Sequence, residues 1–292
     1  MLKKNKPPTL WWLTTCFFAL WCTQAPASTP FGVNWLASQT HQGGISTPND
    51  VAIAFQSTAE ALRTFDALNQ QEPLKNIMAL GRGALNAVSY HSTESLSRQI
   101  IAGHENTDDV SELVNELLAL QNPDGGFGEL ADFDSTVLNT AFALEALAMA
   151  APSETQTTER AITFLTQHQN PDGSFVLNAV NESAIYVTAL ASSALQRFLF
   201  NAKILPYVEA ANDYLYKNQT EDGGWETDWE TAIALLAVAS ATADTSFYKP
   251  AAQILRTHQD NKGSWGEDAY TTALALRALQ YVKRIQFPVE PE

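Results

Sequence analysis

The chain has 292 residues, of which 45% are hydrophobic, enough for one large domain or two small ones. It carries 17 basic residues against 32 acidic ones, a formal net charge of −15, and such an acidic surface repels nucleic acid and anionic lipid. The same balance argues against a diphosphate site, which needs clustered arginine and lysine.

The first 27 residues are predicted to be a secretory signal peptide. A basic start, MLKKNK, precedes an apolar run from Leu10 to Cys22, and Ala25-Pro26-Ala27 matches an A-x-A cleavage pattern. The run is shorter than the ~20 residues that a membrane span needs. Trp21 is bulkier than the small residue expected before a lipid-modified cysteine, so secretion after Ala27 is preferred to a lipoprotein anchor on Cys22.

Cleavage at this point has consequences for the mature protein. We expect a single domain over residues 28–286 and a short tail over residues 287–292, in the periplasm or outside the cell, with no stable membrane span. Both cysteines, Cys16 and Cys22, would leave with the signal, so no disulfide, thiolate nucleophile or cysteine metal ligand would remain. Three lysines would leave too, which makes the mature chain still more acidic. No cofactor and no metal site are expected.

A short phrase then recurs along the chain: glutamine, three residues, glycine, one residue, and a large apolar side chain. It begins at Gln121, Gln169, Gln219 and Gln259, and an earlier copy begins at Gln39. The distance from the earliest copy to the next is about two periods, and a worn marker around residues 78–83 lies between them. The repeat therefore predicts six units.

Each unit contains two predicted helices. Apolar residues recur at spacings of three and four before the phrase, as in Val110 to Gln121, which indicates an amphipathic helix. The stretch after the phrase is rich in alanine, leucine and threonine and is apolar on most sides, beginning with Asp50 to Leu68 in the first unit. A helix that is apolar all round is buried, so the first helix of each pair should be outer and the second inner.

The phrase is predicted to form the turn that connects the outer helix to the inner helix. In QNPDGGFG, Asn-Pro ends the outer helix, because a residue before proline avoids the helical region. Asp-Gly then forms a tight turn in which glycine supplies positive φ. The glutamine is expected to bond backbone groups at the helix end, and the aromatic residue to pack back into the pair.

In this context the phrase resembles the QW-type repeat of terpene cyclases and protein prenyltransferases. The resemblance runs from about Trp35 to Val282. It implies a squalene cyclase-type all-α (α/α)6 toroid, with six inner helices inside a ring of six outer ones. Cobalamin carriers and complement-like thioester domains share this toroid, so the fold leaves the function open.

The resemblance also suggests a catalytic acid. Squalene–hopene-type cyclases protonate an alkene with an Asp-x-Asp-Asp motif, usually followed by threonine, at the start of an inner helix. The nearest match here is Asp132-Phe-Asp134-Ser135-Thr136, which implies Asp134 as general acid with Asp132 raising its pKa. Ser135 replaces the last acid, and alignment on the repeated Thr-Ala pair at Thr140 places the acids one turn too early. The cysteine ligand of prenyltransferase zinc and the thioester signature are both absent.

Acidic and aromatic residues mark the starts of the inner helices, where the ring predicts one mouth of a central cavity. Such a mouth could bind an apolar or amphipathic small molecule, or another secreted protein. Acids in a first helical turn are equally explained as caps. The candidate ligand-binding residues are Tyr90, His91, Glu182, Tyr186, Asp228, Trp229, Glu230, Asp268 and Tyr270.

Three functions remain open on the sequence. The preferred hypothesis is a secreted, non-catalytic toroid that binds a ligand or a protein at the cavity mouth. The alternative is an isoprenoid-acting cyclase, an isomerase or lyase that uses Asp134. A polysaccharide-acting (α/α)6 enzyme would fit secretion and paired carboxylates, but the Gln/Gly/Trp phrase is not typical of that class.

Overall fold

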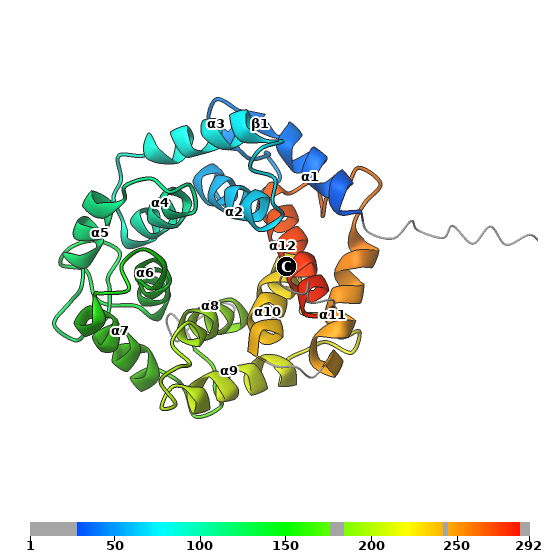
Figure 1. Cartoon of the computed structure of the whole chain (residues 1–292). Helices are drawn as coiled ribbons and strands as arrows, with labels where there is room; N and C mark the ends of the chain where they lie inside the picture. The colour runs from blue at the N-terminus through cyan, green and yellow to red at the C-terminus, as the bar shows by residue number, and fades with distance from the viewer. Residues whose placement is uncertain (1–27, 176–183, 242–244, 287–292) are drawn as a thin grey trace, which may run out of the picture.

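The computed structural model describes residues 28–175, 184–241 and 245–286. Within these ranges the chain forms two concentric rings of α-helices (Figure 1). The inner ring consists of α2 (Ala54–Ala67), α4 (Thr93–Glu105), α6 (Val137–Ala150), α8 (Ala184–Gln196), α10 (Asp228–Ala241) and α12 (Ala269–Gln286). The outer ring consists of α1 (Thr29–Ser38), α3 (Lys75–Asn86), α5 (Ser111–Leu118), α7 (Thr155–Gln167), α9 (Leu205–Lys217) and α11 (Thr245–His258).

The rings close head to tail. Each inner helix contacts the next, and α12 returns to contact α2, while α1 packs against α12. The predicted (α/α)6 toroid is therefore confirmed, with six hairpins in the predicted order. The predicted signal peptide, both cysteines and the predicted tail lie outside the described residues. None of the helices within the described ranges is both long and apolar enough to cross a membrane.

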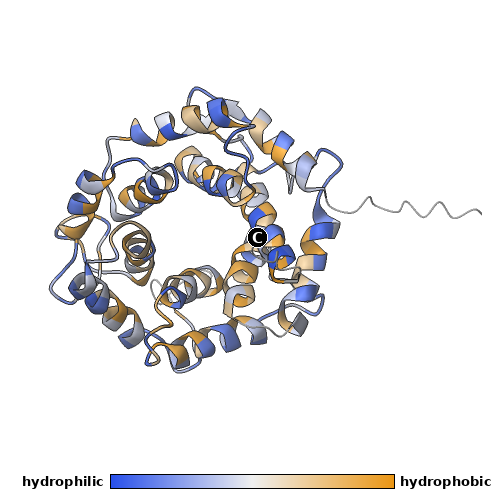
Figure 2. Ribbon diagram, in the orientation of Figure 1, coloured by the Kyte–Doolittle hydropathy of each residue, from blue (hydrophilic) through white to orange (hydrophobic). Residues whose placement is uncertain are grey.

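The inner and outer helices differ in burial as predicted. Ala143, Leu144, Ala146 and Leu147 of α6 are all fully buried, although they point in different directions around the helix. The outer helices bury one stripe only and alternate hydrophilic with hydrophobic residues along their length (Figure 2). Small residues on the inner helices let them pack closely against the neighbouring inner helices and against the outer helices.

One sequence expectation about the second unit is wrong. The worn marker at residues 78–83 lies inside α3, and the chain turns between Asn86 and Thr93 instead. Apolar spacing identified the helix pair, but the turn between α3 and α4 carries no copy of the phrase. In the first unit, the phrase forms a small hairpin of β1 (Thr40–His41) and β2 (Gly44–Ile45).

The marker glutamines join neighbouring hairpins. The Gln121 side-chain amide donates to the carbonyls of Gly125 and Thr157, both at 2.9 Å, and Thr157 belongs to the first turn of the next outer helix, α7. Equivalent glutamines repeat this bond to α9 and α11. Gln259 closes the ring, because it binds Gly263 and the backbone of Ser28 ahead of α1. Gln39 departs from the pattern and bonds only its own helix end.

A buried threonine fixes the start of each of five inner helices. Its hydroxyl accepts the backbone N–H of the large apolar residue in the phrase, as Thr140 does from Phe127 at 2.9 Å. The same bond joins Thr58 to Ile45, Thr188 to Phe175, Thr231 to Trp225 and Thr272 to Trp265. These threonines therefore define the register in which the units correspond.

The glycine of the phrase is required by space as well as by backbone angle. Gly173 has φ +91°, and a Cβ there would lie 2.1 Å from the carbonyl oxygen of Ala210 in α9. The turn thus sits directly against the next outer helix. Only glycine fits this approach without moving backbone.

Candidate functional site

A cavity of about 470 Å³ lies at the centre of the inner ring. Every inner helix contributes to its lining, so the cavity depends on closure of all six hairpins. The lining residues are Glu60, Arg63, Ala67, Arg98, Phe142, Glu145, Tyr186, Leu190, Ser193, Gln196, Arg197, Leu199, Ile233, Leu236, Ser240, Tyr270, Arg277 and Tyr281.

The cavity has two chemically different walls. Helices α2, α4, α6 and α12 contribute its glutamates and three of its arginines, and Arg197 adds the fourth just after α8. Helices α8 and α10 contribute Leu190, Ile233 and Leu236. One side of the cavity is therefore ionic and the other largely apolar.

The cavity opens at the carboxyl ends of the inner helices. Arg98 and Tyr270, nearer the amino ends, are only 3% and 5% exposed. Arg197 and Tyr281, toward the carboxyl ends, are each 37% exposed. The sequence analysis predicted the mouth at the amino ends of the inner helices, but Asp268 and Glu230 there cap helix starts and do not line the cavity.

Glu60 is the centre of the ionic wall. Its Oε1 lies 2.7 Å from Nη1 of Arg98 and 3.8 Å from Nη1 of Arg63, and its Oε2 lies 2.6 Å from Nη2 of Arg277. Burial alone would raise the pKa of this carboxyl. The three arginines outweigh burial and hold the pKa of Glu60 far below its usual range.

Glu145 extends this network toward the mouth. Its Oε1 accepts from Nη2 of Arg63 at 2.7 Å and from Nη2 of Arg197 at 2.8 Å. Burial opposes ionisation here too, but the two arginines lower the pKa of Glu145 to about 2. Both cavity carboxyls are therefore charged at neutral pH, and neither can serve as a proton donor there.

Two predicted site residues do line the cavity floor. Tyr186 and Tyr270 are joined by a side-chain hydrogen bond, and burial raises the pKa of both phenols. Trp229 packs edge-on against Tyr186, with ring centroids 5.6 Å apart. Arg98 lies over the ring of Phe142 at 5.1 Å, which adds a cation–π contact to the floor.

The predicted catalytic acids lie elsewhere. Asp132 and Asp134 are exposed in the loop before α6 and are not among the cavity-lining residues. The hydrogen bond from the Phe127 N–H to the Thr140 hydroxyl shows that Thr140 corresponds to the repeated threonines of the other units. In this alignment Asp132 and Asp134 precede the inner helix by about one turn. The structure does not bring either carboxyl to the cavity.

Most of the remaining candidates hold helix starts or surface contacts. Asp268 accepts backbone N–H groups of Thr271 and Val51, and burial raises its pKa. The other contacts are Glu230 with Thr227, Asp228 with His258 at 2.7 Å, His91 with Glu116 at 2.5 Å, and Tyr90 with Glu129 at 2.7 Å. Glu182 lies outside the described residues.

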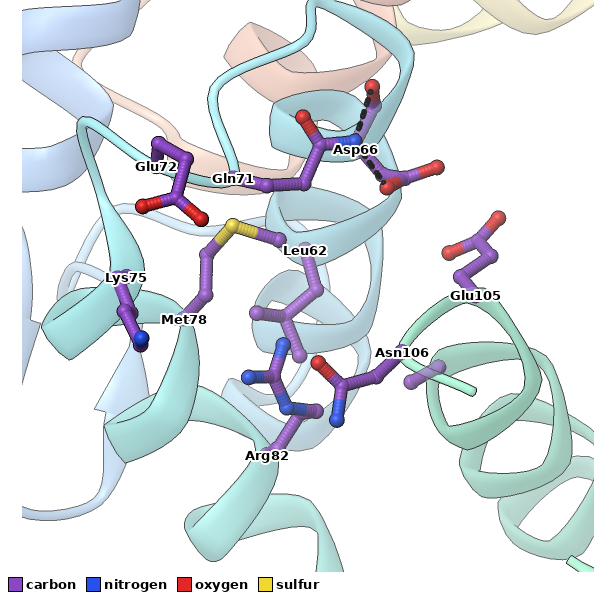
Figure 3. A pocket seen from close by; sticks show the side chains of 10 residues that line it. Leu62, Asp66, Gln71, Glu72, Lys75, Met78, Arg82, Glu105 and Asn106 are labelled. Carbon is purple, nitrogen blue, oxygen red and sulfur yellow. Dashed lines mark hydrogen bonds between the residues drawn. The ribbon is translucent and has the colours of Figure 1, made fainter. Parts of the chain in front are cut away.

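A second, smaller hollow of about 150 Å³ lies between α2, α3 and α4 (Figure 3). Glu105 lines it together with Asp66, Glu72 and Arg82. Burial raises the pKa of Glu105 to about 7; Arg63 opposes this and the Asp66 carboxylate adds to it. In the described part of the chain, no group of three or more histidine, cysteine or acidic side chains is arranged to hold a metal ion.

The arginines of the cavity were missed by sequence reasoning. They occur as single residues about 35 to 100 positions apart, so no basic cluster is visible along the chain. A signal did exist at Arg277, which interrupts a run of apolar and small residues in the first three turns of α12. A charged residue on an all-buried helix should point to a paired charge or a cavity.

The fold and cavity define an α/α toroid with a central ligand-sized chamber. Residues 84–243 match the family described as the prenyltransferase alpha-alpha toroid domain, and the chain belongs to this family. A 77-residue stretch is 36% identical to squalene–hopene cyclase of Zymomonas mobilis, covering 24% of this chain and 12% of that enzyme. The match thus spans a small part of the curated relative.

Solved structures share the fold at low sequence identity. The type II terpene cyclase MstE from Scytonema superposes with TM-score 0.71 at 14% identity, over 88% of this chain and 98% of that one. The ent-copalyl diphosphate synthase of Streptomyces platensis gives 0.64 at 19%, over 79% and 51%. An unsaturated glucuronyl hydrolase specific for heparin gives 0.66 at 16%, over 88% and 96%.

Proposed function

We propose that this chain handles isoprenoids in the manner of the terpene cyclase-type toroids, enclosing an apolar chain in its central cavity. The observation that carries the proposal is the cavity itself. Its volume of about 470 Å³ falls within the ~300–1,000 Å³ typical of small-molecule sites. Leu190, Ile233 and Leu236 supply the apolar wall along which such a chain would lie.

The relatives favour a small-molecule function over a protein-binding one. They include a squalene–hopene cyclase and type II terpene cyclases, one of them solved with geranylgeranyl dihydroxybenzoate as substrate. Each of these names describes a protein that takes an isoprenoid skeleton. This favours the isoprenoid hypothesis over a toroid that uses its rim to bind another protein.

Turnover is the second candidate, favoured by the cyclase names among these relatives. It would use Asp134 as proton donor, and Asp134→Asn should then abolish product formation while leaving binding intact. The exposed position of Asp134, together with the two ionised cavity glutamates, favours binding over turnover through these groups. Product analysis by gas chromatography after incubation with squalene and with geranylgeraniol decides between them.

Binding is tested with uncharged isoprenoids and a pair of matched variants. Leu236→Trp should fill the cavity from its apolar wall, whereas Leu80→Trp adds the same ring on the exposed face of α3, where Leu80 is 59% exposed. We expect farnesol and geranylgeraniol to bind the wild type and the Leu80 variant equally. Leu236→Trp should weaken binding at least tenfold. Equal binding by all three proteins, or none by the wild type, would contradict the proposal.

A further inference from the structure

The small hollow between α2, α3 and α4 combines an apolar base with a charged rim. Leu62, Met78 and Ala102 form the base and are only 2%, 5% and 6% exposed. None of the residues that line this hollow also lines the central cavity. Its volume is about 150 Å³, and a cavity of that size holds a molecule as large as benzene, with ~six non-hydrogen atoms. The hollow is therefore a separate space that suits a much smaller ligand.

Two acids line the hollow at the carboxyl ends of inner helices. Asp66 lies in the last turn of α2, and Glu105 is the last residue of α4. The carboxyl end of a helix carries a partial negative charge, so an acid is unfavourable there and a cation is favourable. The two acids and the two helix ends thus favour a positive charge in the hollow.

The carboxyl of Glu105 lacks a close partner. It forms no hydrogen bond and no ion pair within the described part of the chain, whereas Oδ1 of Asp66 accepts from the Gln71 amide at 2.6 Å. Burial raises the pKa of Glu105 to about 7, because no donor at close range stabilises the charged form. A half-buried carboxyl of this kind is satisfied by a ligand that brings a donor.

The surrounding charges do not supply that donor. The charged groups that act on Glu105 or line the hollow are Arg63 and Asp66 of α2, Glu72 just before α3, Lys75 and Arg82 of α3, Glu145 of α6 and Arg277 of α12. Both arginines outside the hollow are held by the carboxylates of the central cavity, Arg63 by Glu145 and Arg277 by Glu60. The two rim charges are exposed and of opposite sign. Among the half-buried lining groups, two acids face one base, so one further cation balances them.

We infer that this hollow binds a small organic cation, a primary amine with a short apolar body. The ammonium group lies between Asp66 and Glu105, and the body packs against Leu62 and Met78. Figure 3 shows these two apolar side chains between Asp66 and Arg82, so the ammonium is kept apart from the guanidinium. The amine keeps its proton up to about pH 10. Binding should therefore tighten as the pH rises and Glu105 ionises.

Four probes of similar shape test which charge the hollow selects: isopentylamine, isopentanol, isovalerate and leucine, which is isopentylamine with an added carboxylate. Nuclear magnetic resonance titration of isotope-labelled protein measures their affinities. We expect isopentylamine to bind at least tenfold more tightly than the other three, and its affinity to rise about tenfold from pH 6 to pH 8 as Glu105 ionises. Equal affinity for isopentanol, an affinity that does not change with pH, or no binding of the amine would overturn the inference. Tighter binding of leucine would replace the cation site by a zwitterion site.

Variants separate the roles of the lining residues. Glu105→Gln keeps the shape of the side chain and removes its charge, so it should weaken isopentylamine binding at least fivefold and abolish the rise with pH. Arg82→Met removes the opposing cation and should leave the affinity unchanged or raise it. Glu112→Gln, at an exposed position on the outer helix α5, is the matched control and should change neither the affinity nor its pH dependence. Equal weakening by the two glutamine variants, or loss of binding in Arg82→Met, would refute the assignment.

Discussion

Gln259 is one of the side chains that close the ring, alongside the packing of α12 against α1 and α2. It accepts the N–H of Ser28 at 2.6 Å and donates to the carbonyls of Gly263 at 2.8 Å and Ser28 at 3.2 Å. Gln259→Ala removes all three bonds and leaves buried backbone groups unpaired. At about 0.5–1.5 kcal/mol per hydrogen bond, the free energy of unfolding should fall by about 2–4 kcal/mol.

The matched control is Gln39→Ala, because Gln39 occupies the same place in the repeat but bonds only its own helix end. Its substitution should change stability by no more than about 0.5 kcal/mol. Urea unfolding followed by circular dichroism measures both variants. If the two lose equal stability, or if Gln259→Ala loses less than about 1 kcal/mol, the closing bond does not hold the ring as described.

Three further predictions concern the turns, the small hollow and export. Gly173→Ala should destabilise the protein by more than ~3 kcal/mol, because its Cβ would strike Ala210, whereas Gly83→Ala in open space on α3 should stabilise it by ~0.5–1 kcal/mol in the same melts. Glu105 holds its proton more tightly folded than unfolded, so wild-type stability should fall between pH 4.5 and about 7. Glu105→Gln should flatten that fall, with a gain of roughly 2–3 kcal/mol at pH 8 and little change at pH 4; an unchanged pH profile would refute the assignment. Expression with the native leader in a bacterial host should yield exported protein whose first residue by Edman degradation is Ser28, and an intact Met1 would disprove the signal peptide.

The fold was predictable because the same phrase and the same pair of helices repeat along the chain. Five copies of the phrase each place a turn between an amphipathic helix and an apolar one, and the structure shows why each letter recurs. Gln121 ties its turn to α7, Gly173 fits against α9, and Phe127 is held by Thr140. Because the helix pair repeats six times, the ring could be predicted although the turn between α3 and α4 carries no copy of the phrase.

The site was less predictable because it is made of residues that occur once. Sequence patterns drew attention to the acids at the helix starts, and the structure uses Asp268 and Glu230 there as caps. Tyr186 and Tyr270 were found because they follow the same helix starts on the side that faces the cavity. Arg63 and Arg277 come together only through contact between the first and last inner helices, which no local pattern could indicate.

The most direct test of the proposed isoprenoid site places a ligand in the central cavity. A farnesol analogue bearing a diazirine at its apolar end is added to the protein and activated by light, and modified residues are located by mass spectrometry. An isoprenoid site in the central cavity predicts adducts on α8 and α10, at Leu190, Ile233 or Leu236, that excess farnesol suppresses. Adducts confined to the outer helices, or insensitive to excess farnesol, would contradict it.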